Sequence, residues 1–169
     1  MKLDFGCGKK CPKGTVGMDI FPFKAQSSDY SDVSVIGDIT KGLPFKNESF
    51  TDVRSYHVLE HVDLKYYSNI WKELARVLVP GGRLVTRVPY WTHDSAIITG
   101  HRSFHNEMFY ERSLESGELG KYFTLIRFEY KYTDEFVEKS EPEKIFARKH
   151  YLNSVETLVI KLKRKPILK

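Results

Sequence analysis

The chain has 169 residues, of which 41% are hydrophobic, and its 27 Lys and Arg against 22 Asp and Glu give a formal net charge of +5. This composition fits one compact domain, residues 1–169, and leaves little room for a second. Two cysteines, Cys7 and Cys11, exclude a disulfide framework and a paired Cys-x-x-Cys zinc site. The modest basic excess allows an acidic partner such as nucleic acid, but a solvated surface is the favoured explanation.

The chain shows no basic-then-apolar signal pattern at its start and no apolar run of about 18 residues, the length that crosses a bilayer. We therefore expect a cytoplasmic protein without a membrane segment.

Short apolar runs bounded by Gly, Pro, Asp or Asn predict the first strands. In chain order these are Lys2–Phe5, Thr15–Ile20, Val33–Ile36, Thr51–Tyr56 and Arg83–Val88. Because the runs lack strict alternation, they are typical of buried strands in a mostly parallel sheet that is covered on both faces.

The clearest helix is predicted between the fourth and fifth strands, where apolar residues recur at intervals of three and four. Asp63 would cap its start and Pro80-Gly81-Gly82 would end it. A second helix is expected over Ser103–Leu114. Two alternating segments, Tyr122–Tyr132 and Ser154–Lys163, predict closing strands, with a charged and partly helical surface segment between them.

This order predicts an α/β fold, a Rossmann-like doubly wound and mostly parallel sheet with an antiparallel edge strand. Residues 9–14 are too few for a crossover helix, and the segment "FPFKAQSSDYSD" has no apolar period. We therefore expect a reduced number of helices on one face. A thinly covered sheet would expose an apolar patch, which predicts a homodimer or another partner over that face.

Ligands of such sheets bind beyond the carboxyl ends of the strands. At these ends stand, in order, "LDFGCG", "GMDI", "GDITKGLPFKNESFTDVRSYHVLEHV" and "ELARVLVPGGRLVTRVP". Together they resemble the class I S-adenosylmethionine-dependent methyltransferases, and especially the small type 11-like members with a Leu-Glu-His segment. The resemblance covers Leu3 to about Pro89, and it implies a cofactor-binding half, residues 1–89, and an acceptor-side half, residues 90–169.

The resemblance implies S-adenosylmethionine as the cofactor and assigns its contacts. Gly6 and Gly8 would turn the backbone close to the ligand. Asp4 would face the methionine amino group, directly or through water, and Asp19 would accept hydrogen bonds from the ribose hydroxyls. Ile20 would pack against the adenine face, and Asp38 and the backbone of Ile39 would meet the adenine amine and the ring edge. The implied cofactor-binding set is Asp4, Phe5, Gly6, Cys7, Gly8, Asp19, Ile20, Asp38, Ile39 and His57.

Gly6 and Gly8 could also form a tight turn, and Asp19 and Asp38 could be caps; it is their convergence at consecutive strand ends that favours the cofactor. A dinucleotide oxidoreductase would need Gly-x-Gly-x-x-Gly opening a helix. Here the third glycine position is Cys11, followed by Pro12, so that alternative is disfavoured.

His57 follows the fourth strand, where the resemblance places groups beside the transferred methyl. It is a candidate general base or a contact to the methionine part of the cofactor, and both roles stay open. Glu60 and His61 would shape the loop before the helix. The segment "SYHVLEH" lacks the Pro-Pro-aromatic signature of enzymes that methylate base amines, and no cysteine stands on the acceptor side to attack a pyrimidine.

The segment "PYWTHDSAIITGHRSFHNEMFY" is the candidate acceptor region. Tyr90, Trp91, His93 and His105 would line a lid over the acceptor. His101 and His105 would share a helix face, as metal ligands can, but no third ligand stands at a defined spacing, so no metal is predicted.

The sequence thus predicts a methyltransferase that acts on a small molecule or on an exposed group of a macromolecule, with nucleic acid allowed but not favoured. The alternative is a non-catalytic S-adenosylmethionine-binding or regulatory module, which the missing helices make conceivable.

Overall fold

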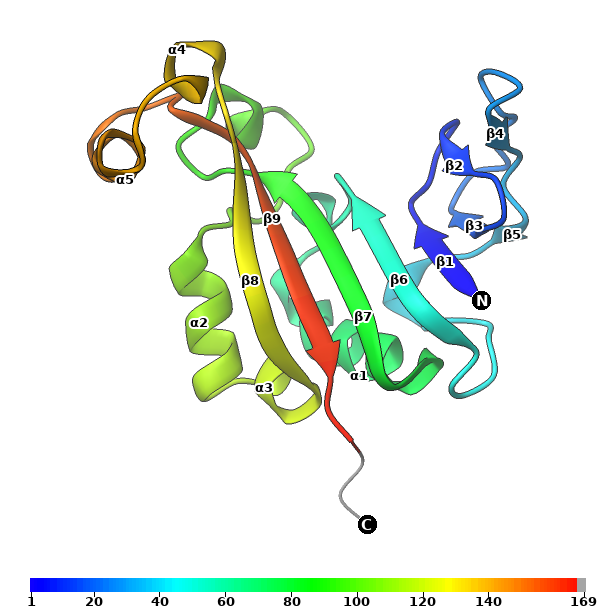
Figure 1. Cartoon of the computed structure of the whole chain (residues 1–169). Coiled ribbons are helices and arrows are strands. Elements are labelled where there is room, and N and C mark those ends of the chain that lie inside the picture. The colour runs from blue at the N-terminus through cyan, green and yellow to red at the C-terminus, as the bar shows by residue number, and fades with distance from the viewer. Residues whose placement is uncertain (167–169) are drawn as a thin grey trace.

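The computed structural model describes residues 1–166 and contains a seven-stranded sheet in the order β5-β3-β1-β6-β7-β9-β8. The strands β5, β3, β1, β6 and β7 are parallel, whereas β9 runs antiparallel to β7 and β8 antiparallel to β9. This arrangement confirms the predicted α/β fold with an antiparallel edge (Figure 1). The strands are β1 (Lys2–Phe5), β3 (Val16–Asp19), β5 (Val35–Ile36), β6 (Phe50–Tyr56), β7 (Leu78–Pro89), β8 (Phe123–Tyr132) and β9 (Val155–Arg164).

The helices are short, and most of them lie in the second half of the chain. The α-helices are α1 (Tyr67–Val77), α2 (Glu107–Glu115), α3 (Glu118–Tyr122), α4 (Asp134–Val137) and α5 (Glu141–His150). Single 3₁₀ turns form η1 (Ile39–Lys41), η2 (Leu59–His61), η3 (Leu64–Tyr66) and η4 (Asp94–Ile97). Within residues 1–166, no helix is both long enough and apolar enough to cross a bilayer.

Two predicted boundaries were wrong. The strand β7 begins at Leu78, so Pro80-Gly81-Gly82 lies inside it as an irregularity instead of following the helix, and Gly81 takes a φ of +79° there. The helix α2 begins only at Glu107, because the Asn106 side chain caps it by accepting the N–H of Phe109 at 2.9 Å.

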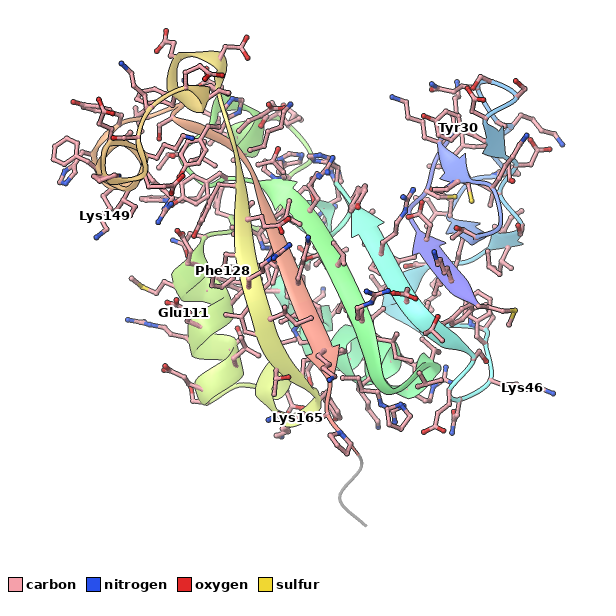
Figure 2. The ribbon with its side chains drawn as sticks, viewed as in Figure 1. Tyr30, Lys46, Glu111, Phe128, Lys149 and Lys165 are labelled. Carbon is pink, nitrogen blue, oxygen red and sulfur yellow. The ribbon has the colours of Figure 1, made fainter. Side chains whose placement is uncertain are left out.

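One face of the sheet packs against helices and holds the core. Leu84 and Ile160 are fully buried there, and α1 contributes Leu74 and Trp71. Phe128 of β8 points to the same side, where its ring centroid lies 6.4 Å from that of Tyr110 in α2 (Figure 2). The core therefore lies between the sheet and the helices α1, α2 and α3.

The opposite face carries no helix in front of β6, β7, β9 and β8, which is the face that Figure 1 shows. The strand β7 alternates after all: Arg83 is exposed and Val85 and Arg87 are partly exposed, whereas Leu84 and Thr86 between them are buried. The prediction of strands covered on both faces was wrong, because charged residues at every second position let this face meet water.

Charged groups pair across this face of the sheet, although Leu125 and Ile126 of β8 are exposed. Arg83 pairs with Asp52 across two strands at 2.6 Å, and Lys161 pairs with Glu129 at 2.7 Å. The Tyr56 ring lies between two guanidinium groups, 4.4 Å from that of Arg87. The homodimer or partner contact over this face stays a prediction.

Two thiols and a small two-stranded sheet replace the missing helices beside β1 and β3. The strand β2 (Cys11–Pro12) pairs antiparallel with β4 (Tyr30–Ser31). A Cβ on Gly17 would lie 2.5 Å from the Cys11 sulfur and 2.9 Å from the Cys7 sulfur, and both cysteines are free and buried. The expected reduction in helices is thus observed, and the thiols fill the space above this strand.

Replacing Gly17 with Ala should lower the free energy of unfolding by about 1–3 kcal/mol, because the new methyl group would overlap the Cys11 sulfur. Urea unfolding followed by circular dichroism measures this change. The double variant Gly17→Ala/Cys11→Ala should lose less than the sum of the two single losses. A Gly17→Ala protein as stable as wild type would contradict this packing.

Candidate functional site

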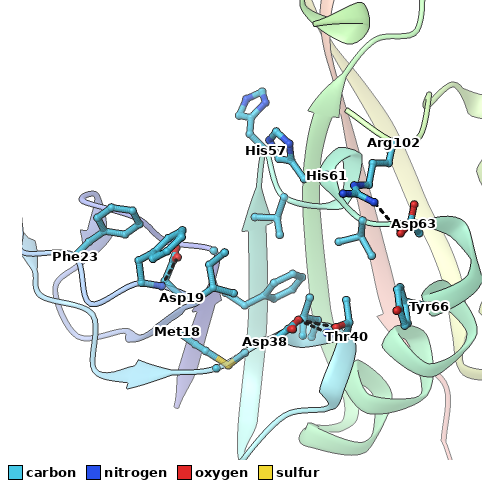
Figure 3. A pocket seen from close by; sticks show the side chains of 18 residues that line it. Met18, Asp19, Phe23, Asp38, Thr40, His57, His61, Asp63, Tyr66 and Arg102 are labelled. Atoms are coloured by element: carbon cyan, nitrogen blue, oxygen red, sulfur yellow. Dashed lines mark hydrogen bonds and ion pairs between the residues drawn. The ribbon is translucent and has the colours of Figure 1, made fainter. Parts of the chain in front are cut away.

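A cavity of about 630 Å³ opens at the carboxyl ends of β1, β3, β5 and β6 (Figure 3). Its lining combines apolar residues with a few acidic and basic side chains. The lining residues are Phe5, Gly6, Met18, Asp19, Ile20, Phe21, Phe23, Gly37, Asp38, Ile39, Thr40, His57, Val58, His61, Val62, Asp63, Tyr66 and Arg102. Seven of the ten residues predicted to bind the cofactor line this cavity.

Gly6 lets the loop after β1 pack against the loop after β6. Its φ is +68°, and a Cβ at this position would overlap the Cγ2 methyl of Val58. The Gly6 N–H donates to the Met18 carbonyl at 2.7 Å, which ties the same loop to β3. Glycine is therefore required here both by conformation and by space.

Asp19 ends β3 with its carboxylate held by backbone groups. Oδ2 accepts the N–H of Gly8 at 2.9 Å, and Oδ1 accepts the N–H of Phe21 at 3.2 Å. The side chain thus both joins two loops and lines the cavity, and each oxygen keeps a lone pair for a ligand.

Asp38 begins the 3₁₀ turn η1. Its Oδ1 accepts the Thr40 N–H at 2.9 Å and the Thr40 hydroxyl at 2.7 Å. The hydrogen bond from that hydroxyl is the main cause that lowers the pKa of the Asp38 carboxyl. The cap turns the chain so that Ile39, which is buried, contributes to the cavity wall.

Phe21 and Phe23 also line the cavity, although they were not among the predicted cofactor-binding residues. Their rings meet edge to face with centroids 5.7 Å apart. Phe21 is 55% exposed, so part of its ring is open to a ligand. Their position directly after the acid that ends β3 was the signal available in the sequence.

Asp4 does not face this cavity. Its carboxylate is buried on the other side of β1 and pairs with Arg54 at 2.7 Å. Burial raises the pKa of Asp4, while Arg54 opposes that rise. Cys7 and Gly8 do not line the cavity either. The predicted direct contact of Asp4 is corrected, because side chains alternate along a strand and Phe5 already points inward.

His57 follows β6 in a left-handed conformation, with a φ of +57°. Such a conformation in a residue other than glycine is costly and is found most often at functional sites. Its Nδ1 lies 3.2 Å from Oε1 of Glu60, a carboxylate that is only 1% exposed. The loop that was predicted to have only a shaping role thus supplies an acid that orients His57.

A second cavity of about 280 Å³ lies beside the first. It is lined by His57, Glu60, His61, Pro89, Ser95, Ile98, His101, Glu156 and Thr157. His57 and His61 line both cavities, so the two spaces share a wall of imidazole groups.

The sequence of residues 3–86 matches the family model of a methyltransferase domain. The matched range therefore includes all the strands and loops that carry the lining residues of the larger cavity from Phe5 to His61. The chain is a class I S-adenosylmethionine-dependent methyltransferase. No curated protein matches its sequence.

Solved structures share the fold of this methyltransferase at low sequence identity. An S-adenosylmethionine-dependent methyltransferase from Archaeoglobus fulgidus superposes with a TM-score of 0.68 at 20% identity, covering 96% of this chain and 85% of the other. The N-methyltransferase NodS from Bradyrhizobium japonicum, crystallised with S-adenosylhomocysteine, gives 0.64 at 15% identity over 98% and 78%. A complex containing the Haloferax volcanii Trm112 methyltransferase activator includes a chain that gives 0.64 at 16% identity over 98% and 82%.

The four residues predicted to form a lid over the acceptor of this methyltransferase lie outside both cavities. Tyr90 is buried and donates its hydroxyl hydrogen to Glu107 at 3.0 Å. His93 caps η4 by accepting the N–H of Ser95. Trp91 is half exposed and lines neither cavity. In the structure, Tyr90 instead belongs to the core and His93 caps a turn.

His105, the fourth of these residues, is buried in a hydrogen-bonded network. Its Nε2 lies 2.9 Å from the Ser103 hydroxyl, and its Nδ1 lies 3.0 Å from the Tyr110 hydroxyl. Burial lowers the pKa of His105 to about 4, so the imidazole is neutral near neutral pH. It precedes α2, so it shares no helix face with His101.

His105 should make the methyltransferase sensitive to acid. The unfolded chain binds this proton at the ordinary His pKa of about 6.5, whereas the folded chain binds it only near 4. The free energy of unfolding should therefore fall by about 3 kcal/mol as the pH drops from about 7 to below about 4. Urea unfolding at a series of pH values measures this loss.

The variant His105→Gln should show a weaker dependence on pH over that range, because it lacks the titrating group. The exposed His150, replaced in the control His150→Gln, should leave the dependence unchanged. Equal slopes for wild type and His105→Gln would contradict the assignment.

Proposed function

We propose that this methyltransferase binds S-adenosylmethionine in the larger cavity and transfers its methyl group to an acceptor held in the smaller one. The observation that carries the proposal is the position of His57, which directly follows β6 and lines both cavities. A group at such a boundary can contact both the cofactor and the acceptor, as in-line transfer requires.

The residues of the larger cavity fit the chemical parts of the cofactor. The Asp19 carboxylate suits the two ribose hydroxyls, and the aliphatic side chains of Ile20 and Ile39 suit the flat faces of adenine. Asp38 stands where it can accept from the adenine amine. Gly6 lets the loop after β1 lie against Val58, so the backbone of this loop can form the wall beside the methionine part. When bound, the cofactor supplies a methyl group that its sulfonium makes strongly electrophilic.

His57 is suited to take a proton from the acceptor. An Nδ1–H that donates to Glu60 Oε1, 3.2 Å away, leaves the Nε2 lone pair free. The buried carboxylate fixes the ring and stabilises the imidazolium that forms, in the manner of a base held by an acid. His57 is therefore the proposed general base for a hydroxyl or amine acceptor.

The smaller cavity limits the acceptor to a small molecule or a protruding group of a macromolecule. Its volume of about 280 Å³ and its lining of imidazole, carboxylate and hydroxyl groups favour a polar acceptor. We place the reaction in the cytoplasm, because Cys7 and Cys11 are free thiols whose sulfur atoms both lie against Gly17.

The variant Asp19→Ala should raise the Kd of S-adenosylmethionine by about 10- to 100-fold, because it removes the acceptor of charge-assisted hydrogen bonds. Isothermal titration calorimetry measures the Kd. The variant Asp19→Asn keeps one acceptor oxygen, so its Kd should lie between those of wild type and Asp19→Ala. The exposed Asp29, replaced in Asp29→Ala, provides the control. Unchanged binding by Asp19→Ala would contradict the ribose assignment.

The variant His57→Asn should lower the rate of methyl transfer by about 100- to 10,000-fold, the usual contribution of a general base. Asparagine tolerates the left-handed conformation of this position, so the backbone is preserved. Transfer of labelled methyl groups to fractions of extract from the source organism measures the rate and reveals the acceptor class. Binding of S-adenosylmethionine without any transfer in any fraction would contradict the proposed activity.

A further inference from the structure

Three potential metal ligands meet at the floor of the smaller cavity. One ligand atom from each of Glu60, His61 and His101 lies within 4.8 Å of the other two. The first two belong to the turn η2, and His101 comes from the loop between η4 and α2, forty residues further along the chain. The fold thus builds a cluster of two imidazoles and one carboxylate.

The buried carboxylate of this cluster, that of Glu60, has a hydrogen-bond partner for only one of its two oxygens. Glu60 is 1% exposed, and its Oε1 faces His57. Its Oε2 has no hydrogen-bond partner among residues 1–166. A buried carboxylate oxygen without a partner costs several kcal/mol, and a cation placed against it would offset that cost.

The hydrogen bonds of the two histidines leave one ring nitrogen of each free to bind a metal ion. The Nδ1 of His61 lies 3.2 Å from the Gly100 carbonyl, and the Nδ1 of His101 lies 3.2 Å from the Ala96 carbonyl. A carbonyl only accepts, so each Nδ1 carries the proton and each Nε2 keeps its lone pair. A ring nitrogen that donates to a backbone carbonyl is the usual support of a metal-binding histidine.

We propose that Glu60 Oε2, His61 Nε2 and His101 Nε2 bind one Zn²⁺ ion. Two imidazoles and one carboxylate form a ligand set typical of zinc sites that keep a fourth position open. The adjoining cavity of about 280 Å³ provides that position with space. The thiols of Cys7 and Cys11 do not line this cavity.

The next inference rests on the proposed function: the zinc site would select an acceptor that carries a hydroxyl group. The acceptor oxygen occupies the open position, where the ion lowers the pKa of the hydroxyl. The proton passes to Nε2 of His57, and the oxygen attacks the methyl carbon. The new C–O bond forms as the C–S bond breaks, and the sulfonium becomes a neutral thioether.

Isothermal titration calorimetry of the tag-free full chain with ZnCl₂, without S-adenosylmethionine, tests the site. Wild type should bind one ion per chain. His101→Gln and His61→Gln should each weaken binding by about 100-fold or more, since loss of a ligand exceeds loss of its supporting contact. His150→Gln removes an exposed imidazole outside the cluster and should bind like wild type.

Two further measurements make the result decisive. Co²⁺ should give a visible spectrum of a site with nitrogen and oxygen ligands, without sulfur-to-metal charge transfer. Circular dichroism should show that the variant of His61, whose side chain is exposed, keeps the wild-type fold. No zinc binding, binding retained in both histidine variants, or a charge-transfer band that Cys11→Ser removes would each overturn the proposal.

The same samples titrated with S-adenosylmethionine separate this proposal from the proposed function. Cofactor binding without zinc binding would overturn the metal site alone. Zinc binding without cofactor binding would overturn the proposed function and leave the metal site supported.

Discussion

The close packing of two loops, through Gly6 and Val58, is the constraint on which the site depends. A side chain at position 6 would overlap the Val58 methyl group. The loop after β1 can therefore approach the loop after β6 only when residue 6 is glycine. This contact places the proposed cofactor floor beside His57. Because His57 in turn meets Glu60, the same packing joins the larger cavity to the cluster of acid and imidazole groups in the smaller one.

The sheet of this methyltransferase is covered by helices on one side only. Its bare side meets water because exposed and buried side chains alternate along the strands. Charged and aromatic side chains stand at every second position and neutralise one another across strands, as Arg83 does with Asp52. Beside β1 and β3, Cys7 and Cys11 fill the space that a crossover helix would occupy. The carboxyl ends of the strands remain where ligands of such sheets bind, so the reduced set of helices leaves the site intact.

Local patterns predicted much of this fold, whereas contacts across the chain decided the rest. The strands and the missing crossover helix followed from short apolar runs and from the few residues between Lys9 and Gly14. The direction of Asp4 was also available, since a period of two puts it opposite Phe5. The burial of His105 could not be predicted, because it depends on the hydroxyl group of Tyr67 in the distant helix α1 as well as on that of Tyr110. The meeting of His61 with His101 likewise needs the folded loop.

The most direct test of the central claim is a titration of the isotope-labelled protein with S-adenosylhomocysteine, followed by amide proton–nitrogen correlation spectra. The account predicts that the largest shifts arise in the loops after β1, β3, β5 and β6, at amides such as those of Gly6, Phe21, Ile39 and His57. Shifts confined to the bare face of β8 and β9, or no shifts at saturating ligand, would contradict it.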